Sequence, residues 1–291
     1  MPTRIGRWSS SHLLAAVVMA VLAVGVTRAA WGDILTIARN DPEHSHIFLV
    51  PLVAAWMVWV RWPRLRHTRP VGTVVGPLVA VLGALVAGYG FHNGVQSFWH
   101  GGSVLVVLGC VLSVLGRQVL FRFFPAVAVL VFLIPVPAAL RLQISGPLQV
   151  GTSRVAEQVL AFIGMAVERS GNLLTVDGTP VNIVEACNGM RMVYGLLLVA
   201  YAFSFGLPLK NWVRLVVLAL SPLAAIFCNV VRILPTVWVY GRYPENVGNL
   251  FHELAGWVML PVAFLILLGF IKLMQWAMVP VLRYPLASQA T

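Results

Sequence analysis

The sequence predicts an all-α polytopic membrane protein, built as a bundle of about eight transmembrane helices. Hydrophobic residues make up 59% of its 291 residues, charged residues make up only 10%, and the mean hydropathy is +0.88. A soluble domain carries roughly 25% charged residues because its surface must meet water. Apolar stretches of about 20 residues, the length that a helix needs to cross the hydrocarbon core, recur along the chain. These observations exclude an ordinary soluble domain.

Eight stretches of the chain are apolar and long enough, or nearly so, to be membrane spans. They must be helical, because an unpaired backbone polar group finds no water inside the hydrocarbon. The fourth stretch is short, and its boundary with the fifth is the least defined. No polar linker divides the chain, so residues 1–291 are predicted to form a single membrane domain. The predicted spans are residues 11–31, 47–62, 74–91, 102–117, 119–140, 187–208, 212–238 and 254–279.

The charged residues predict the orientation of these spans. With the N-terminus inside, 12 of the 20 Lys and Arg residues fall in inner loops, and all nine acidic residues fall outside or at the outer boundary. The opposite topology would violate the positive-inside rule, so both termini are predicted to be cytoplasmic. The net charge of +11 therefore indicates membrane topology and not a nucleic-acid partner. The inner basic residues are Arg4, Arg7, Arg61, Arg64, Arg66, Arg69, Arg117, Arg122, Lys210, Arg214, Lys272 and Arg283.

One predicted outer segment, residues 141–186, is long enough to hold structure of its own. Its first part has helical periodicity and predicts an amphipathic helix on the outer membrane surface. Asp177-Gly178 then lies between two short β-prone runs, which predicts a small hairpin before the sixth span. The apolar face of the predicted helix comprises Leu148, Val155, Val159, Phe162 and Ala166, opposite Arg154, Glu157 and Gln158.

Cys187 is a candidate nucleophile at the predicted N-terminus of the sixth span. Unpaired amide groups and the helix dipole favour a thiolate there, and the thiolate is the form that attacks carbonyl carbons. A cysteine can equally be a small buried hydrophobe, which is the interpretation that fits Cys110 and Cys228 inside apolar spans. Three cysteines are too few for a disulfide framework and lack the spacing of metal ligands.

Arg232 and His252 lie at the same predicted membrane boundary as Cys187. An arginine at the centre of a span costs about 2.5–3.5 kcal/mol, so it usually has a partner or a function, although snorkelling to headgroups would also explain it. Asn229 lies on the same helical face as Arg232. His252 alone fits an interfacial histidine as well as a catalyst. Together the three supply a nucleophile, a cation for an oxyanion and a proton shuttle, which acyl transfer requires.

Several other polar residues have weaker assignments. Glu185 and Arg191 flank the thiol and could orient a partner or simply form an ion pair. Four outer histidines raise the question of a metal site, but the chain has no HExxH motif, so we predict none. No ATP-binding or dinucleotide motif is present, so we predict no cofactor. The four histidines are His44, His46, His92 and His100.

These residues lie in motifs that resemble those of the exosortase/archaeosortase family of membrane-embedded transpeptidases. The resemblance covers about residues 40–260, with a similar order of motifs. Asn188-Gly189-Met190 stands where many members have Ser-Gly-Leu, which suggests a subfamily with a different sorting signal. The matching motifs are His44-Ser45-His46-Ile47-Phe48-Leu49-Val50-Pro51-Leu52, Leu133-Ile134-Pro135-Val136-Pro137, Val184-Glu185-Ala186-Cys187-Asn188-Gly189-Met190-Arg191, Asn229-Val230-Val231-Arg232-Ile233 and His252.

The resemblance implies an enzyme of the bacterial inner membrane with its active site on the periplasmic side. Its substrates would be secreted proteins whose C-terminal tail, often PEP-CTERM-like, consists of a motif, a membrane helix and basic residues. Cys187 would form a thioester with the substrate, Arg232 would stabilise the oxyanion and His252 would move protons. An amine on a lipid or glycan would be the acceptor. The supporting or substrate-binding residues would be Glu185, Asn188, Arg191, Asn229 and His46.

Other classes of function fit part of the pattern. A transporter would place ionisable residues near the bilayer midplane, whereas the candidates here gather at one boundary. A non-catalytic export or assembly factor predicts that Cys187→Ala leaves function intact. A hydrolytic intramembrane protease would share the thioester step and differ only in using water. The sequence leaves open the sorting motif, the acceptor, the oligomeric state and whether His252 or another outer histidine moves the proton.

Overall fold

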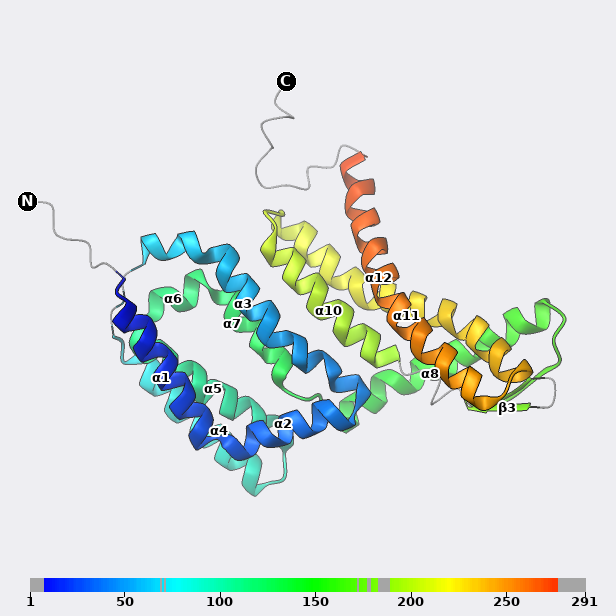
Figure 1. Ribbon diagram of the computed structural model, residues 1–291, viewed down its shortest axis with the longest axis horizontal. Helices are drawn as coiled ribbons and strands as arrows, with labels where there is room; N and C mark the ends of the chain where they lie inside the picture. The colour runs from blue at the N-terminus through cyan, green and yellow to red at the C-terminus, as the bar shows by residue number, and fades with distance from the viewer. Residues whose placement is uncertain are drawn as a thin grey trace, which may run out of the picture. The chain divides into compact units, whose positions relative to one another are not determined.

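The computed structural model of the chain describes residues 8–68, 70, 72–171, 173–176, 179–182 and 189–276. The chain divides into two compact units, Met1–Pro137 and Ala138–Thr291, and helices dominate both (Figure 1). The predicted all-α polytopic class is confirmed. The single membrane domain stays a prediction.

The first unit is built around a hairpin of two helices, α4 and α5, and α1 packs against α5 (Figure 1). A short turn with Gly94 at φ 67° joins α4 to α5, so the two helices are antiparallel. The elements of this unit are α1 (Ser10–Val26), α2 (Arg28–Asn40), η1 (Pro42–Leu49), α3 (Val50–Arg61), η2 (Trp62–His67), α4 (Val75–His92), α5 (Gln96–Leu115), α6 (Arg117–Arg122), α7 (Phe124–Ala128) and η3 (Val129–Leu133), where η denotes a 3₁₀ helix.

Glycines set the close approach of α4 and α5. Gly76, Gly83 and Gly90 recur every seven residues on α4 and are all buried. A Cβ at any of them would collide with backbone atoms of α5, and the same holds in reverse for Gly102 and Gly109. Lipid offers no hydrophobic drive for helices to associate, so close packing over small residues is the main attraction available to this pair.

The first predicted span, residues 11–31, is not one straight helix. It breaks at Thr27, where α1 and α2 meet at an angle of 80°. The Thr27 hydroxyl donates to the Ala23 carbonyl at 2.7 Å and accepts the Trp31 indole N–H at 2.9 Å. These bonds supply partners for polar groups at the break, which a bend at membrane depth requires.

The fifth predicted span, residues 119–140, is also broken, and proline chemistry explains why. Phe123 leaves helical geometry and Pro125 follows in the first turn of α7, while Ile134, directly before Pro135, is extended with ψ of 114°. A residue that precedes proline is driven out of the helical region by the proline ring, so Pro135 and Pro137 keep the chain extended here. Short helices therefore replace the long span, and α5 begins earlier than predicted and reaches 20 residues.

The second unit contains three long helices that lie side by side, α10, α11 and α12 (Figure 1). Their core is apolar and includes Leu196 of α10, Val217 of α11 and Leu267 of α12. The elements of this unit are α8 (Ala138–Phe162), β1 (Val167–Ser170), β2 (Leu173–Val176), β3 (Thr179–Asn182), α10 (Gly189–Gly206), α11 (Asn211–Arg242) and α12 (Glu245–Trp276).

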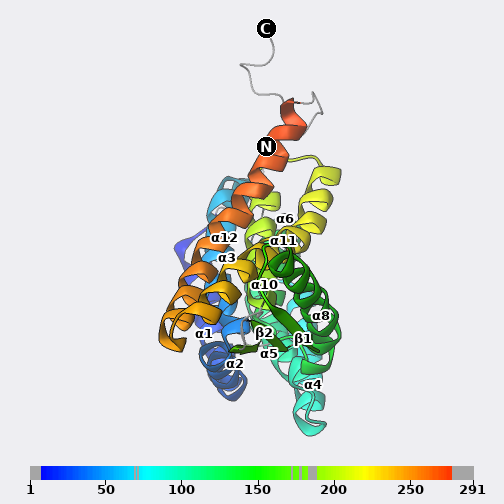
Figure 2. The ribbon, with the colours of Figure 1, turned by 90° about the vertical axis from the view of Figure 1, so that its right-hand side faces the viewer.

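The segment before α10 is a helix followed by a small sheet, as Figure 2 shows. The sheet has three antiparallel strands in the order β1-β2-β3, so it exceeds the predicted hairpin by one strand. The turn at Asp177-Gly178 lies outside the described residues. The strand β2 is paired on both sides, with Leu174 opposite Arg169 and opposite Val181.

The predicted apolar face of the surface helix is wrong for α8. Phe162 is 94% exposed and Val155 40%, whereas Ala156 and Leu160 are buried against β2 and against Ile233 of α11. Apolar residues occur all round this helix, so the periodicity does not single out one face. Small side chains at Ser153 and Ala156 permit the closer contact, and they decide which face packs.

The predicted count of eight spans is not reached among the described residues. Five helices are long and apolar enough to cross a membrane, and the bent α1–α2 pair would be a sixth. Two shorter apolar helices, Phe124–Leu133 and Met190–Gly206, occupy the fifth and sixth predicted spans. The multi-pass class is confirmed, and the orientation stays a prediction. The five helices are Pro42–Leu65, Val75–His92, Gln96–Leu115, Asn211–Arg242 and Asn246–Met274.

Replacing Gly83 by Ala is expected to lower the free energy of unfolding by about 1–3 kcal/mol, because overpacking displaces backbone. The added Cβ would lie 2.7 Å from the Val106 amide nitrogen and 2.8 Å from the Gly102 carbonyl oxygen. Gly88→Ala, on the same helix, is the matched control, since its Cβ meets nothing within 4 Å. Thermal unfolding in detergent measures both variants. Equal melting temperatures for the two would contradict the close α4–α5 contact.

Candidate active site

Arg232 is a buried cation on α11 with a neighbour on its own helix. It is 5% exposed, and its Nη2 donates to Oδ1 of Asn229 at 2.9 Å. Asn229 is itself 6% exposed and lies three residues earlier, on the same helical face. The predicted placement of the two on one helical face is therefore confirmed, and the hydrogen bond between them is a finding of the structure. Because a guanidinium is always protonated in proteins, α11 buries a positive charge at this point.

The neighbouring helix α12 is shaped to accommodate this guanidinium. A Cβ at Gly256 would lie 3.0 Å from Nη1 of Arg232, so the absence of a side chain leaves room for the cation. His252 lies four residues earlier, one turn away on the same face of α12. Its Nδ1 is buried and has no hydrogen-bond partner among the described residues. This nitrogen is consequently open to accept or donate a proton.

The third helix, α10, contributes Arg191 in its first turn. The guanidinium carbon of Arg191 lies 4.8 Å from the centre of the Trp257 ring, in a cation–π contact. Trp257 directly follows Gly256, which faces the Arg232 guanidinium, so α10, α11 and α12 meet here. The structure thus brings together four predicted site residues: Arg191, Asn229, Arg232 and His252. The sequence analysis did not identify Gly256 and Trp257 as site residues. They follow His252 by four and five residues on one predicted helix, and this spacing could have indicated that they lie close to it.

Three other predicted site residues, Glu185, Cys187 and Asn188, lie outside the described residues. In the sequence they immediately precede α10, whose first described residue is Gly189. Their assignments as nucleophile and supporting residues stay predictions.

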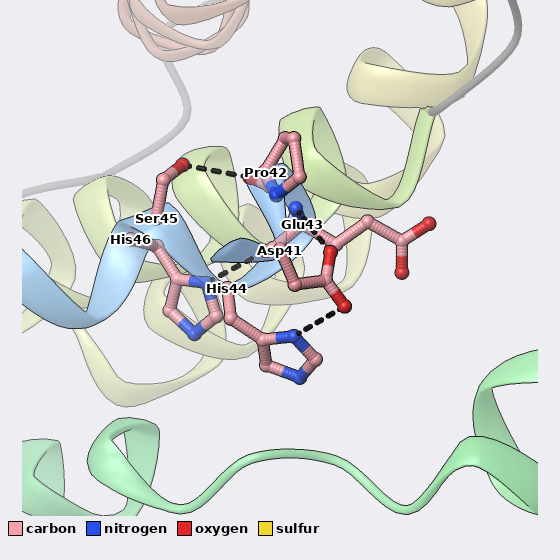
Figure 3. A network of polar contacts seen from close by, with 6 residues as sticks. All are labelled: Asp41, Pro42, Glu43, His44, Ser45 and His46. Atoms are coloured by element: carbon pink, nitrogen blue, oxygen red, sulfur yellow. Dashed lines mark hydrogen bonds and ion pairs between the residues drawn. The ribbon is translucent and has the colours of Figure 1, made fainter. Parts of the chain in front are cut away.

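His46 belongs to the first unit, where it is part of a polar cluster on η1 (Figure 3). Asp41 caps this 3₁₀ helix by accepting the Glu43 N–H at 2.9 Å, and its other carboxylate oxygen lies 3.1 Å from Nδ1 of His44. Nδ1 of His46 lies 3.1 Å from the Glu43 carbonyl oxygen. Both histidines are buried, so these contacts fix the turn that leads into α3.

A second polar pair in the first unit, with one partner buried, was not predicted. Nε2 of His100, on α5, lies 2.9 Å from Oδ2 of Asp33, on α2, and His100 is fully buried. The residues are 67 positions apart, so no local pattern could have paired them. Among the described residues, no group of three or more His, Cys, Asp or Glu side chains could hold a metal ion.

Comparison with known proteins bears directly on these residues. The family described as transmembrane exosortase matches residues 31–269, which include the whole of the α10–α12 site and the segment that precedes it. The chain belongs to the transmembrane exosortase family. The predicted exosortase/archaeosortase resemblance is confirmed, and with it membership of a family of membrane peptidases and transpeptidases.

One curated exosortase-family relative matches part of the chain. It is a probable archaeosortase E from Methanocaldococcus jannaschii, 28% identical over 105 residues. The aligned part covers 36% of this chain and 54% of that protein, so the match spans about half of the relative's length. No solved structure matches the chain.

Removing the amide partner of Arg232 is expected to destabilise this exosortase-family chain. Asn229→Ala should lower the free energy of unfolding by about 1.5–3 kcal/mol, as for a hydrogen bond to a charged group. The matched control is Asn211→Ala, at the exposed start of the same helix, where Asn211 accepts from Arg214 at 3.2 Å. The control should change stability by under about 0.5 kcal/mol. Unfolding in detergent tests this, and equal losses would contradict a buried Asn229–Arg232 pair.

Proposed function

We propose that this protein is a cysteine transpeptidase that cleaves the C-terminal sorting signal of secreted proteins and transfers them to an acceptor. The observation that supports it best is the convergence of Arg191, Arg232 and His252 from three helices, beside the start of the helix that Cys187 precedes in the sequence. A cationic site with an open imidazole nitrogen suits a reaction that passes through an oxyanion and moves protons.

In the proposed reaction, Cys187 attacks the scissile carbonyl carbon while His252 takes the thiol proton. The tetrahedral oxyanion forms against the guanidinium of Arg232, which already holds its charge in a water-poor environment and needs no reorganisation. The C–N bond breaks, His252 gives its proton to the leaving amine, and a thioester remains. An incoming amine then attacks the thioester and loses a proton to His252, the C–S bond breaks, and His252 returns this proton to the Cys187 sulfur.

The proposed substrates are secreted proteins with a short motif, a membrane helix and a basic tail, and the proposed acceptor is a lipid or glycan amine. The enzyme is assigned to the bacterial inner membrane, with both termini cytoplasmic and the site on the periplasmic side. Membrane lipid and the substrate's own helix would surround the bundle. Family membership supports this substrate class, and the charge distribution of the loops supports the orientation.

Cys187→Ala is expected to abolish processing of a co-expressed secreted protein that carries such a tail, because it removes the nucleophile. Cys110→Ala is the matched control and should process the substrate normally, since Cys110 is a partly buried residue in the middle of α5. The measurement is the mass of the substrate's C-terminus. An added mass on the new C-terminus indicates transfer, whereas a free carboxylate indicates hydrolysis. Normal processing by Cys187→Ala would overturn the catalytic assignment.

Gly256→Ala is expected to lower the rate of processing about three- to tenfold while leaving the fold intact. The new Cβ lies 3.0 Å from Nη1 of Arg232, so the flexible guanidinium must shift by a few tenths of an ångström. Small displacements of catalytic groups are costly, with about a hundredfold loss for 1 Å. Gly269→Ala, on the same helix, is the control because its Cβ meets nothing within 4 Å. Equal rates in the two variants would argue against a catalytic position for Arg232.

A further inference from the structure

The end of α3 and the adjoining η2 form an apolar hollow that the proposed reaction does not use. The hollow has a volume of about 710 Å³ and is lined by Trp59, Val60, Trp62 and Pro63. Its two indoles are largely uncovered, since Trp59 is 71% exposed and Trp62 is 49% exposed. The volume falls in the range of small-molecule sites, roughly 300–1,000 Å³.

The hollow lies at the end of a membrane-spanning helix and next to concentrated positive charge. The candidate span Pro42–Leu65 ends there, which places the indoles where tryptophans of membrane proteins gather, at the interface with water. Residues 61–70 contain four arginines and no acidic residue. Arg61 is buried and its Nη1 contacts the Met57 carbonyl oxygen, so Arg64, which is exposed, is the described guanidinium that can meet a ligand.

A tether from the N-terminal part of the chain fixes the shape of this segment. The Trp8 indole donates to the carbonyl oxygens of Leu65 at 2.9 Å and Thr68 at 3.1 Å, and the Thr68 hydroxyl donates to the Leu65 carbonyl oxygen at 2.9 Å. The turn after η2 is thus held in one conformation. A preformed site loses less entropy on binding than a mobile one.

We infer that this hollow binds an anionic phospholipid, with an acyl chain against Trp59 and Trp62 and the headgroup phosphate at Arg64. The apolar lining favours a hydrocarbon chain. Residues 61–70, which contain four arginines and no acidic residue, favour a negative headgroup. A membrane lipid carries both groups, the hydrocarbon chain and the negative headgroup, at the depth where this span ends. Arginines beside tryptophans at the end of a membrane span form the arrangement that recognises anionic lipid headgroups.

The test uses the full-length protein in mild detergent, titrated with phosphatidylglycerol or with phosphatidylcholine of identical acyl chains, with bound lipid counted by native mass spectrometry. Phosphatidylglycerol should bind at least about fivefold more tightly, the factor expected for one arginine near the surface. Arg64→Gln should remove this preference and leave phosphatidylcholine binding unchanged. Trp59→Ala should weaken the binding of both lipids.

The control is Arg242→Gln, which removes another arginine beside a tryptophan, since its guanidinium lies 5.3 Å from the centre of the Trp238 ring. It should keep the wild-type preference for phosphatidylglycerol. Equal binding of the two lipids by the wild type would overturn the inference, as would an Arg64→Gln variant that behaves like Arg242→Gln. Displacement of phosphatidylglycerol by inorganic phosphate alone would also overturn it, because it would show an anion site without a lipid requirement.

Discussion

The structure depends on one constraint, that hydrocarbon offers polar groups no hydrogen-bond partner, so their partners must come from the protein itself. Where the chain bends between α1 and α2, the Thr27 hydroxyl bonds to a backbone carbonyl of the preceding turn and accepts an indole N–H. Where 3₁₀ helix η1 begins, Asp41 caps it. Side chains follow the same constraint, since His100 contacts Asp33 and Arg232 contacts Asn229. Nδ1 of His252 departs from it, because this buried nitrogen has no hydrogen-bond partner among the described residues.

The candidate active site follows from the same rule applied to a cation. Arg232 donates to the neutral amide of Asn229, and the absence of a side chain at Gly256 leaves space for its guanidinium. Arg191 adds a second guanidinium, which lies over the ring of Trp257 on α12. The described site is accordingly suited to receive negative charge.

The two units differ in the residues that lie at their helix–helix contacts. In the first, heptad-spaced glycines let α4 and α5 approach until their backbones touch. In the second, the core between α10, α11 and α12 combines large apolar side chains such as Leu196 and Leu267 with small ones such as Ala225 and Ala263. Glycine has a different use there, because Gly256 leaves space for the guanidinium of Arg232.

The sequence by itself determined the membrane class and the family, and it placed Asn229 and Arg232 on one helical face. Hydropathy identified the apolar helices, and Asn229 and Arg232 share one helix, where spacing dictates proximity. Tertiary structure alone decided that His252 and Arg191 approach this pair, because their separation along the chain carries no information about helix packing. It also decided which face of α8 packs, through contacts with β2 and α11, and it added a third strand to the sheet. The breaks near Thr27 and in the fifth predicted span have local causes, hydrogen bonds four residues away and prolines, which hydropathy does not record.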